Sequence, residues 1–223
     1  RLSHDEQLKM CIPCATGIRV FNQDAFEALI TFIISANNNI GRIAGIVERL
    51  CALCGERAEL DGKEYFLFPK PDAIAAREES ELLAIGAGYR APYIIKSARR
   101  IAEGYGLEKL RDMPLDAARK ELLTFYGVGP KVADCVLLFG LGHTDAFPVD
   151  VWIGRALSEI YFGGEKARRQ ETERAIRALG SESGIVQQYI FHYARQNAIG
   201  KKQNAKKIGK KGETVVDTGA ALC

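Results

Sequence analysis

The part of this sequence that decides its fold reads Gly127-Val128-Gly129-Pro130-Lys131-Val132-Ala133-Asp134. Two glycines separated by one residue allow a tight turn, and a proline directly after them is typical of the first position of a helix. Backbone N–H groups at such a turn bind anions such as phosphate. An amine follows on the new helix, and a carboxylate follows in Pro148-Val149-Asp150. These residues therefore predict a phosphate-binding hairpin followed by an amine and a carboxylate.

Apolar residues at helical spacing extend from this stretch over nearly the whole chain. We expect helices over residues 24–34, 43–54, 72–85, 92–104, 114–126, 131–141, 151–161 and 185–197. Asp24 is placed to cap the first of them, and Gly62, Pro69 and Pro71 mark a loop region after the second. Strand-like alternation is confined to residues 17–21. The pattern predicts an all-α protein.

The chain has 223 residues, of which 47% are hydrophobic, enough for one compact unit or two small lobes. We expect one domain over residues 1–199. The formal net charge is +3, but the residues from Ile199 onward include six lysines and two acids. The rest of the chain is therefore close to neutral, so any phosphate-binding surface has to be local. Residues 200–223 are predicted to form a basic, flexible tail, with a nonspecific phosphate clamp as the alternative.

The sequence lacks the patterns of export and of membrane insertion. Its start, Arg1 to Glu6, is charged and does not resemble a signal peptide, and no apolar run is long enough to span a bilayer. We therefore expect an intracellular protein without a membrane partner, in the cytoplasm or nucleoid if the source is prokaryotic. Because the chain begins with arginine rather than methionine, we also expect that an N-terminal segment has been removed.

Two C-x-x-C pairs, Cys11/Cys14 and Cys51/Cys54, raise the question of a zinc site. The second pair falls on the apolar stripe of the helix predicted over residues 43–54, so we interpret Cys51 and Cys54 as core side chains of a helix that ends at Gly55. No four-cysteine cluster follows the glycine-lysine stretch, which argues against an iron–sulfur centre. We predict no metal site built from these cysteines.

A helix over residues 114–126, the glycine turn and a helix from Lys131 together predict a helix-hairpin-helix motif. The N–H groups at Gly127 and Gly129 then bind a DNA phosphate without reading sequence. Many non-enzymatic DNA-binding modules carry this motif. Lys131 and Asp150 favour chemistry, although a phosphate contact and a simple helix cap are the alternatives for them. Cys135 lies one turn beyond Lys131, on the same helix face.

With its flanking residues, this motif resembles the helix-hairpin-helix, Gly/Pro…Asp superfamily of base-excision DNA glycosylases, and within it the 8-oxoguanine DNA glycosylase family. Further signatures of that family follow in order: Ser35-Ala36-Asn37-Asn38-Asn39-Ile40 with Arg42, then Gly88-Tyr89-Arg90-Ala91, then Gly184 with Gln187 and Phe191. The resemblance covers residues 16–198. It implies two helical lobes with the helix-hairpin-helix motif at the cleft between them. The family also has an N-terminal domain that contains a sheet, and we expect that domain to be largely absent from this chain.

The resemblance implies a bifunctional DNA glycosylase/AP lyase that acts on double-stranded DNA with 8-oxoguanine opposite cytosine. Lys131 is implied as the nucleophile, whose neutral amine attacks C1′ of a flipped nucleotide and leaves a Schiff base. Asp150 is implied to stay ionised and to stabilise oxocarbenium-like charge on the sugar. We expect a monomer that needs no cofactor. The resemblance to the superfamily also implies that a monovalent cation can bind at the carbonyl groups of the hairpin.

The resemblance also assigns roles to the residues that contact the duplex once the damaged nucleotide is flipped out of it. Tyr89 resembles the wedge that fills the vacated stack. Asn37, Arg42 and Arg90 resemble the side chains that bind the estranged cytosine, whose edge presents one donor and two acceptors. Taken singly, each has an ordinary alternative: a helix cap for Asn37, a solvated helix position for Arg42 and a half-buried core position for Tyr89.

For the damaged base, the resemblance implies a pocket with Cys135 and Phe191 on its two faces, Gln187 at its Watson–Crick edge and Phe139 on its wall. Gln187 and Phe191 are four residues apart, on one helix face, where ordinary packing is the alternative.

Some positions depart from the family pattern. Phe139 stands for a methionine, Ala194 for an acid, Trp152 for a histidine, and Tyr126 for the proline often found before the hairpin. These departures indicate a divergent bacterial or archaeal branch, with an altered substrate range as the alternative.

Two other functions remain open on the sequence. One is a related helix-hairpin-helix glycosylase for other damage, such as oxidised pyrimidines; the absent four-cysteine cluster and the presence of Asn37, Arg42 and Arg90 argue against it. The other is a non-catalytic DNA-binding module. Lys131 together with Asp150 argues against that function, because phosphate binding needs no carboxylate.

Overall fold

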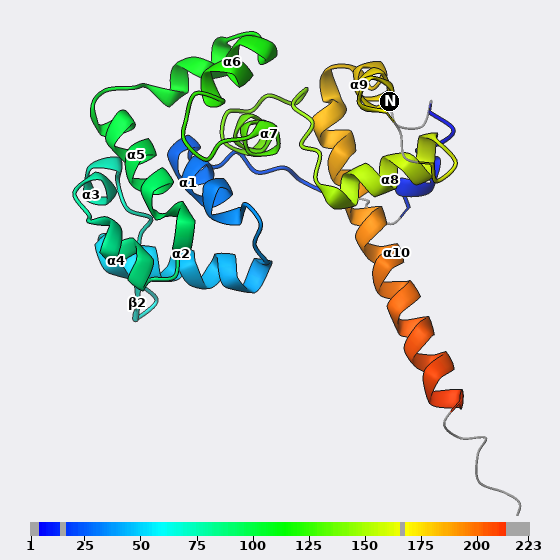
Figure 1. The fold of residues 1–223 in the computed structure, drawn as a ribbon, viewed down its shortest axis with the longest axis horizontal. Helices are drawn as coiled ribbons and strands as arrows, with labels where there is room; N and C mark the ends of the chain where they lie inside the picture. Colours follow the sequence, from blue (N-terminus) through cyan, green and yellow to red (C-terminus); the bar gives the residue numbers. More distant parts are fainter. Residues whose placement is uncertain (1–4, 14–16, 166–167, 213–223) are drawn as a thin grey trace, which may run out of the picture. The chain divides into compact units, whose positions relative to one another are not determined.

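The computed structural model describes residues 5–13, 17–165 and 168–212. The chain divides into two compact units (Figure 1). The larger unit comprises Arg19–Pro148 and Leu179–Ile185, and the smaller comprises Arg1–Ile18, Val149–Ala178 and Val186–Cys223. Each unit is described by itself below.

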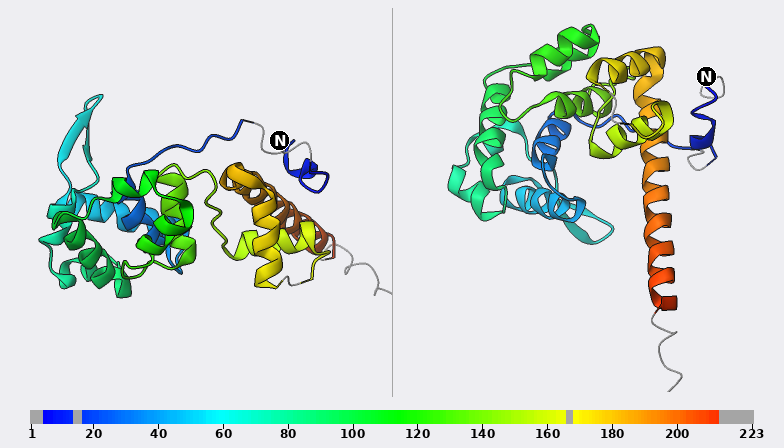
Figure 2. Two further views of the ribbon diagram at one scale, coloured as in Figure 1. Left: turned by 90° about the horizontal axis from the view of Figure 1, so that it is seen from above. Right: turned by 45° about the vertical axis from the view of Figure 1, so that its right-hand side comes forward.

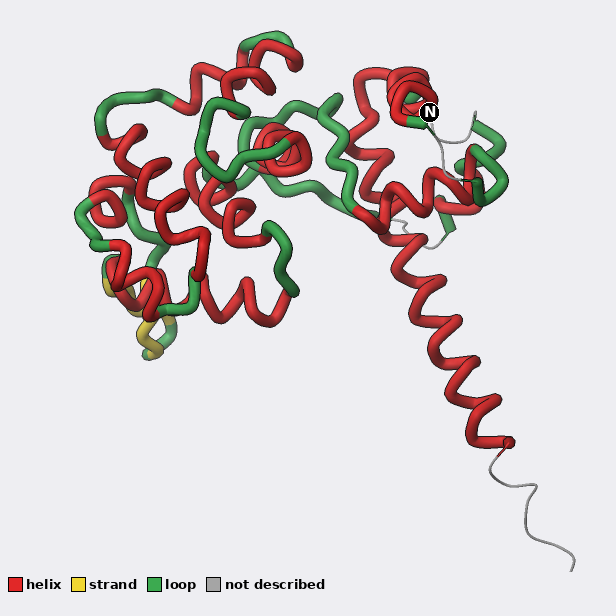
Figure 3. The backbone as a smooth tube through the Cα atoms, in the orientation of Figure 1, coloured by secondary structure: helices red, strands yellow, loops and turns green. Residues whose placement is uncertain are grey.

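The larger unit is a set of short helices around one apolar helix (Figure 3). Its α-helices are α1 (Ala25–Ser35), α2 (Ile40–Cys54), α3 (Pro71–Ala75), α4 (Glu79–Ala84), α5 (Ala91–Ala102), α6 (Leu115–Leu122) and α7 (Pro130–Phe139). Its 3-10 turns are η3 (Gly88–Arg90), η4 (Leu107–Asp112) and η5 (Gly180–Glu182). The strands β1 (Arg57–Leu60) and β2 (Lys63–Phe66) form an antiparallel hairpin.

Helix α1 is the centre of this unit because apolar residues cover most of its circumference. Asp24 caps its start by accepting a 2.8 Å hydrogen bond from the Glu27 N–H, as predicted. Its buried residues pack against α2, α5 and α7, and α7 is itself buried from Val132 to Leu138. The core therefore lies directly beneath the N-terminal half of α7, where Lys131 is found.

The smaller unit contains η2 (Lys9–Cys11), α8 (Val151–Tyr161), α9 (Arg169–Ala178) and most of α10 (Ser183–Gly212). The Tyr161 hydroxyl donates a 2.9 Å hydrogen bond to the Asp5 carboxylate and ties the N-terminal segment to the end of α8. Burial, followed by the hydrogen bond to Asp5, raises the pKa of this phenol above its ordinary value. Over the described ranges, no helix combines the length and the apolar character that a bilayer crossing requires.

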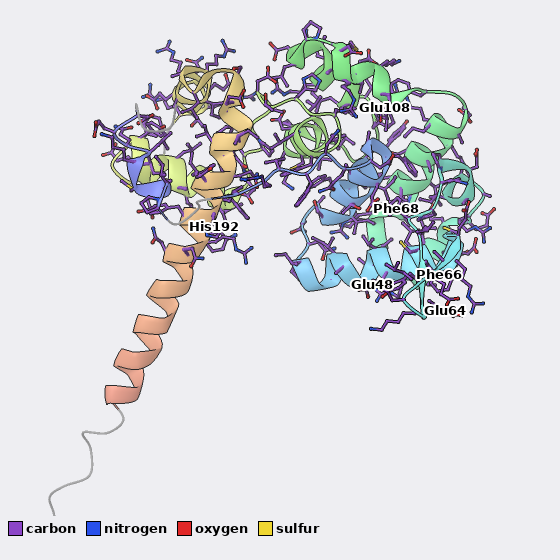
Figure 4. The ribbon with its side chains drawn as sticks, turned by 180° about the vertical axis from the view of Figure 1, so that it is seen from behind. Glu48, Glu64, Phe66, Phe68, Glu108 and His192 are labelled. Carbon is purple, nitrogen blue, oxygen red and sulfur yellow. The ribbon has the colours of Figure 1, made fainter. Side chains whose placement is uncertain are left out.

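The all-α prediction is confirmed, but the small β-hairpin was missed. Residues 57–66 were predicted as loop, whereas they form two strands joined at Asp61 and Gly62, which both have positive φ. The hairpin projects from its unit (Figure 2). Figure 4 shows Glu64 and Phe66 on it. Its strands are four residues long and mostly exposed, so they carry no alternating apolar signal.

Other predicted boundaries also needed correction. Residues 17–21 form no strand, and the helix predicted over residues 72–85 is divided into α3 and α4. Helix α9 was missed because its apolar face is short: Ala175 and Ile176 are half-buried, and most of its other residues are charged and exposed. One of its contacts is a 2.8 Å ion pair between Arg169 and Glu173, four residues apart.

The predicted flexible tail is wrong for residues 200–212, because α10 continues to Gly212. Lysine, alanine and glutamine favour helix, and extending an existing helix needs no new nucleation. The boundary predicted between residues 199 and 200 therefore falls inside a helix, while residues 213–223 lie outside the described part of the chain.

Candidate active site

The predicted hairpin joins the end of α6 to the start of α7. Gly127 has φ +77°, and a Cβ atom on it would lie 2.6 Å from Cδ2 of Tyr93, so no other residue fits. Val128 is buried, and its N–H donates a 3.2 Å hydrogen bond to Phe125 O. Among the described residues, the N–H groups of Gly127 and Gly129 have no hydrogen-bond partner. The turn therefore presents free donors at the start of a helix, which is the arrangement that binds an oxyanion.

The two glycines differ in a way that can be tested. Gly127→Ala should lower the free energy of unfolding by roughly 2–4 kcal/mol, because the left-handed backbone and the clash with Tyr93 both add strain. Gly129→Ala should change stability far less, since φ is −94° there and nothing lies within 4 Å of the added Cβ. Chemical denaturation of both variants measures the difference. Equal destabilisation of the two would show that the hairpin is not held against Tyr93.

A partly buried ion pair, whose carboxylate is buried, fixes α7 against α6. Arg119 Nε lies 2.7 Å from Asp134 Oδ1, and Arg119 Nη1 lies 2.7 Å from Asp116 Oδ1. Burial raises the pKa of the Asp134 carboxyl, and the neighbouring Arg119 guanidinium opposes that rise. Removing one partner leaves a buried charge unpaired, which is costly. The orientation of the hairpin relative to its preceding helix is therefore well determined.

Lys131 is half-buried on the first turn of α7, above aromatic rings of the same unit. Its Nζ atom lies 5.0 Å from the centre of the Phe32 ring, and Phe32 stacks on Phe139 at 5.6 Å. Cys135 is buried one turn further along α7, as the spacing predicts. Phe32 was not predicted as a site residue. One sequence feature could have identified it: it is an aromatic residue that lies outside the apolar stripe expected for the helix over residues 24–34.

Arg90 is buried and holds the loop at Ala36 and Asn37 in place by hydrogen bonds. It is 3% exposed, and Nε donates a 3.0 Å hydrogen bond to Ala36 O, Nη2 one of 3.0 Å to Asn37 O, and Nη1 one of 3.3 Å to Ala87 O. The backbone therefore occupies most of its donors. Its predicted contact with a cytosine stays a prediction, and the structure places it beside Asn37, another residue of the predicted cytosine-binding set.

Asn37, Arg42 and Tyr89 lie around Arg90 with exposed side chains. Asn37 has φ +49°, and its side chain has no partner among the described residues. The helix cap considered for it belongs to Asn39, whose Oδ1 accepts a 3.0 Å hydrogen bond from the Arg42 N–H. Arg42 Nη2 also donates to Gly86 O at 3.3 Å.

Tyr89 is 54% exposed, so the core position considered for it is wrong. Its ring lies 4.4 Å from the Arg90 guanidinium carbon, and its hydroxyl donates a 3.2 Å hydrogen bond to Ala36 O. An exposed aromatic ring that is held in place by these two contacts is suited to stacking on a base.

Asp150 is the N-cap of α8, as predicted. Its Oδ1 accepts a 2.8 Å hydrogen bond from the Ile153 N–H. Its Oδ2 has no partner within the described ranges. The cap fixes the direction of the carboxylate and leaves one oxygen free. Trp152, on the first turn of the same helix, is 40% exposed.

The last predicted residues lie near the start of α10. The Gly184 N–H donates a 2.7 Å hydrogen bond to Thr144 O, which holds the start of the helix in place. Glycine is needed at this position because a Cβ atom would lie 2.3 Å from Ala146 O. Gln187 is buried, accepts a hydrogen bond from the Gln188 side chain, and shares a helix face with half-buried Phe191.

The predicted residues fall into two sets. The larger unit holds the hairpin, Lys131, Cys135, Phe139, and Arg90 with the three residues around it. The smaller unit holds Asp150, Gln187 and Phe191.

The cysteines agree in part with their predicted role. Cys54 packs against the core and Cys51 is half-buried on α2, which ends before Gly55. Burial raises the pKa of both thiols, which disfavours the thiolate that zinc requires. No group of three or more histidine, cysteine or acidic side chains gathers among the residues described, which exclude Cys14.

The short α6, the glycine turn and α7 define a helix-hairpin-helix protein with a lysine at the start of its second helix. Comparison with known families agrees and is more specific. Residues 30–182 match the family described as "HhH-GPD superfamily base excision DNA repair protein". The chain belongs to this superfamily.

Similar proteins include a probable N-glycosylase/DNA lyase of Methanothermobacter thermautotrophicus, 35% identical over 215 residues that cover 87% of this chain and 69% of that protein. The N-glycosylase/DNA lyase of Saccharomyces cerevisiae is 38% identical over 65% of this chain and 42% of its own length. A solved structure of the Clostridium acetobutylicum 8-oxoguanine glycosylase/lyase, in complex with double-stranded DNA containing cytosine opposite 8-oxoguanine, superposes with a TM-score of 0.83. It is 37% identical, and the match covers 88% of this chain and 68% of that one.

Proposed function

We propose that this protein is a bifunctional DNA glycosylase/AP lyase that excises 8-oxoguanine opposite cytosine from duplex DNA. The observation that carries the proposal is the position of Lys131, whose amine lies two residues beyond a turn with free N–H donors and above the stacked rings of Phe32 and Phe139. Similarity to the clostridial enzyme supports the substrate. The chain spans about two fifths of the yeast relative's length, so the activity is proposed for the chain as it stands.

In the proposed reaction, the neutral amine of Lys131 attacks C1′ of the flipped nucleotide. The N-glycosidic bond breaks, and its electron pair leaves with the base, which takes up a proton. The nitrogen then passes one of its two protons to O4′ as the C1′–O4′ bond breaks and the sugar ring opens, and a protonated iminium forms between Nζ and C1′. Loss of a proton from C2′ then expels the 3′ phosphate and nicks the strand. The nitrogen must be neutral for the first step, because an ammonium group has no lone pair with which to attack.

Asp150 stabilises the positive charge that develops on the sugar as the base leaves. Its role needs a fixed, ionised oxygen, and the cap to Ile153 supplies the fixed direction while Oδ2 remains available. A helix cap and a catalytic carboxylate are therefore compatible roles for the same side chain.

Different groups of residues recognise the bases of the two DNA strands. Asn37 and Arg42 bind the estranged cytosine from exposed positions, Arg90 holds the loop that carries Asn37, and Tyr89 fills the vacated stack. The roles implied for four residues toward the extruded base stay predictions: Cys135 and Phe139 belong to the larger unit, and Gln187 and Phe191 belong to the smaller one.

A monovalent cation at the hairpin fits the main chain there. The carbonyl groups of Leu123 and Val128 accept no hydrogen bond from the described residues. Carbonyl oxygens are suitable ligands for such an ion, which complements a bound phosphate. We propose that the protein works as a monomer on chromosomal DNA, in the nucleoid if its source is prokaryotic.

Borohydride trapping tests the function. The protein is incubated with duplexes that carry 8-oxoguanine opposite each of the four bases, an oxidised pyrimidine or an abasic site, and with an undamaged duplex as control. Each mixture is then reduced. We expect a covalent adduct with the lesion, and excision opposite cytosine at least about tenfold faster than opposite the other bases, since each matched hydrogen-bonding pair contributes about 1–3 kcal/mol.

The outcomes separate the alternatives. No adduct with 8-oxoguanine or with an abasic site would reject the lyase chemistry and favour a binding module. An adduct with oxidised pyrimidines only would favour the related glycosylase. Equal rates opposite all four bases would reject the roles of Asn37 and Arg42.

A further inference from the structure

A cavity of about 230 Å³ opens beside the hairpin, in the larger unit. It lies between the second half of α5 and the turn that precedes Gly127, and its lining residues are Lys96, Ser97, Arg99, Arg100, Glu103, Thr124, Phe125 and Tyr126. The function proposed above does not use it.

The cavity is basic, with three cationic side chains and one acidic side chain around it. In the described part of the chain, none of the three cations forms an ion pair. Arg99 and Arg100 lie in the last turn of α5, where a positive charge also complements the helix dipole. Lys96 lies a turn earlier, so the dipole does not account for it. Unpaired cations around a cavity indicate an anionic ligand.

The cations are held by contacts that leave donors free. Lys96 Nζ lies 4.3 Å from the centre of the Tyr126 ring. Arg100 Nη1 donates a 2.7 Å hydrogen bond to Thr124 Oγ1, and its guanidinium carbon lies 4.1 Å from the centre of the Phe125 ring. Arg99 Nε donates to Ala75 O at 3.2 Å. Each side chain is thus oriented by the protein without an acidic partner.

A buried hydroxyl adds to this group of donors. Ser97 is 2% exposed, and its Oγ has no hydrogen-bond partner among the described residues. A buried polar atom without a partner costs free energy, which a bound water or a ligand oxygen recovers. An oxyanion is the ligand that suits a hydroxyl and several cations together.

One wall of the cavity directly precedes the phosphate-binding hairpin along the chain. Thr124, Phe125 and Tyr126 line the cavity, and Gly127, with its free N–H, follows directly. Tyr126 is also a departure from the family pattern, and its ring is the surface on which Lys96 rests. The cavity wall and the phosphate-binding turn therefore share one stretch of backbone, residues 124–127.

We propose that the Lys96–Arg99–Arg100 cavity binds a second backbone phosphate of the substrate DNA, adjacent along the strand to the phosphate at the hairpin. The proposal rests on DNA being the substrate. The contact adds affinity and register without reading sequence. It also accounts for DNA binding by a chain whose body is close to neutral, because the positive charge is concentrated beside the turn.

The salt dependence of binding tests the proposal. Lys96→Gln is compared with Lys63→Gln, which removes the same charge from an exposed position on the β-hairpin. The probe is a duplex with a tetrahydrofuran abasic analogue, which cannot form a Schiff base, and affinity is measured by fluorescence anisotropy. Loss of one phosphate contact lowers the slope of log K against log salt by about 0.9. Between about 50 and about 200 mM salt, the wild type should therefore lose roughly 3.5 times more affinity than Lys96→Gln. Lys63→Gln should follow the wild type, and thermal melting checks that both variants are folded.

A scan with single methylphosphonate linkages locates the contact. The wild type should lose affinity when one particular phosphate near the abasic analogue is neutralised, and Lys96→Gln should show no further loss at that linkage. Equal slopes for the two variants, or the same scan for Lys96→Gln as for the wild type, would overturn the proposal. Normal borohydride adducts in that event would leave the glycosylase function intact. Absence of both binding and adducts would reject both.

Discussion

A Lys131→Gln variant should form no borohydride-stable adduct with abasic DNA, and its base-excision rate should fall at least about thousandfold. The reason is chemical: an amide nitrogen is not nucleophilic and cannot form an iminium. The structure indicates that the hairpin survives the change. Gly127 packs on Tyr93 and Asp134 pairs with Arg119, and neither contact involves the Lys131 side chain. The variant should therefore still bind a duplex with the tetrahydrofuran analogue.

Gel detection of the trapped adduct and single-turnover excision measure the two losses. Lys120→Gln on α6 is the matched control, because it removes an exposed lysine from the same helix-hairpin-helix motif and should trap normally. A persistent adduct in Lys131→Gln would show that another amine is the nucleophile. Loss of adduct together with loss of folding or binding would show that the lysine is structural.

Asp150→Asn should reduce the excision rate by about 100- to 1,000-fold while leaving stability unchanged within about 0.5 kcal/mol. Asparagine caps helices about as well as aspartate, so the hydrogen bond from Ile153 is retained. The charge is lost, and with it the stabilisation of the developing positive charge on the sugar.

Asp150→Ala separates the two roles further. It should show the same catalytic loss as Asp150→Asn and an additional destabilisation of about 1 kcal/mol from the missing cap. Single-turnover kinetics and denaturant unfolding of both variants give the comparison. A full excision rate in Asp150→Asn would show that Asp150 is only a cap.

Local sequence signals predicted the elements that depend on local chemistry. Asp24 and Asp150 were recognised as helix caps because a carboxylate before an apolar helix accepts a backbone N–H regardless of what lies elsewhere. The hairpin at Gly127 was predicted for the same reason, since only glycine adopts its backbone readily. The β-hairpin and α9 were missed because mostly exposed, short elements leave too few apolar residues for a periodic pattern to stand out.

The sequence by itself determined the all-α class, the helix-hairpin-helix motif and the lysine that follows it, because helix periodicity, caps and glycine turns are local. Only the tertiary structure decided that Arg90 is buried under the Ala36–Asn37 loop, that Phe32 lies beneath Lys131, and that Lys96 rests on Tyr126 beside the hairpin. These contacts join residues distant along the chain. They depend on how helices pack, and no local pattern of residues encodes that packing.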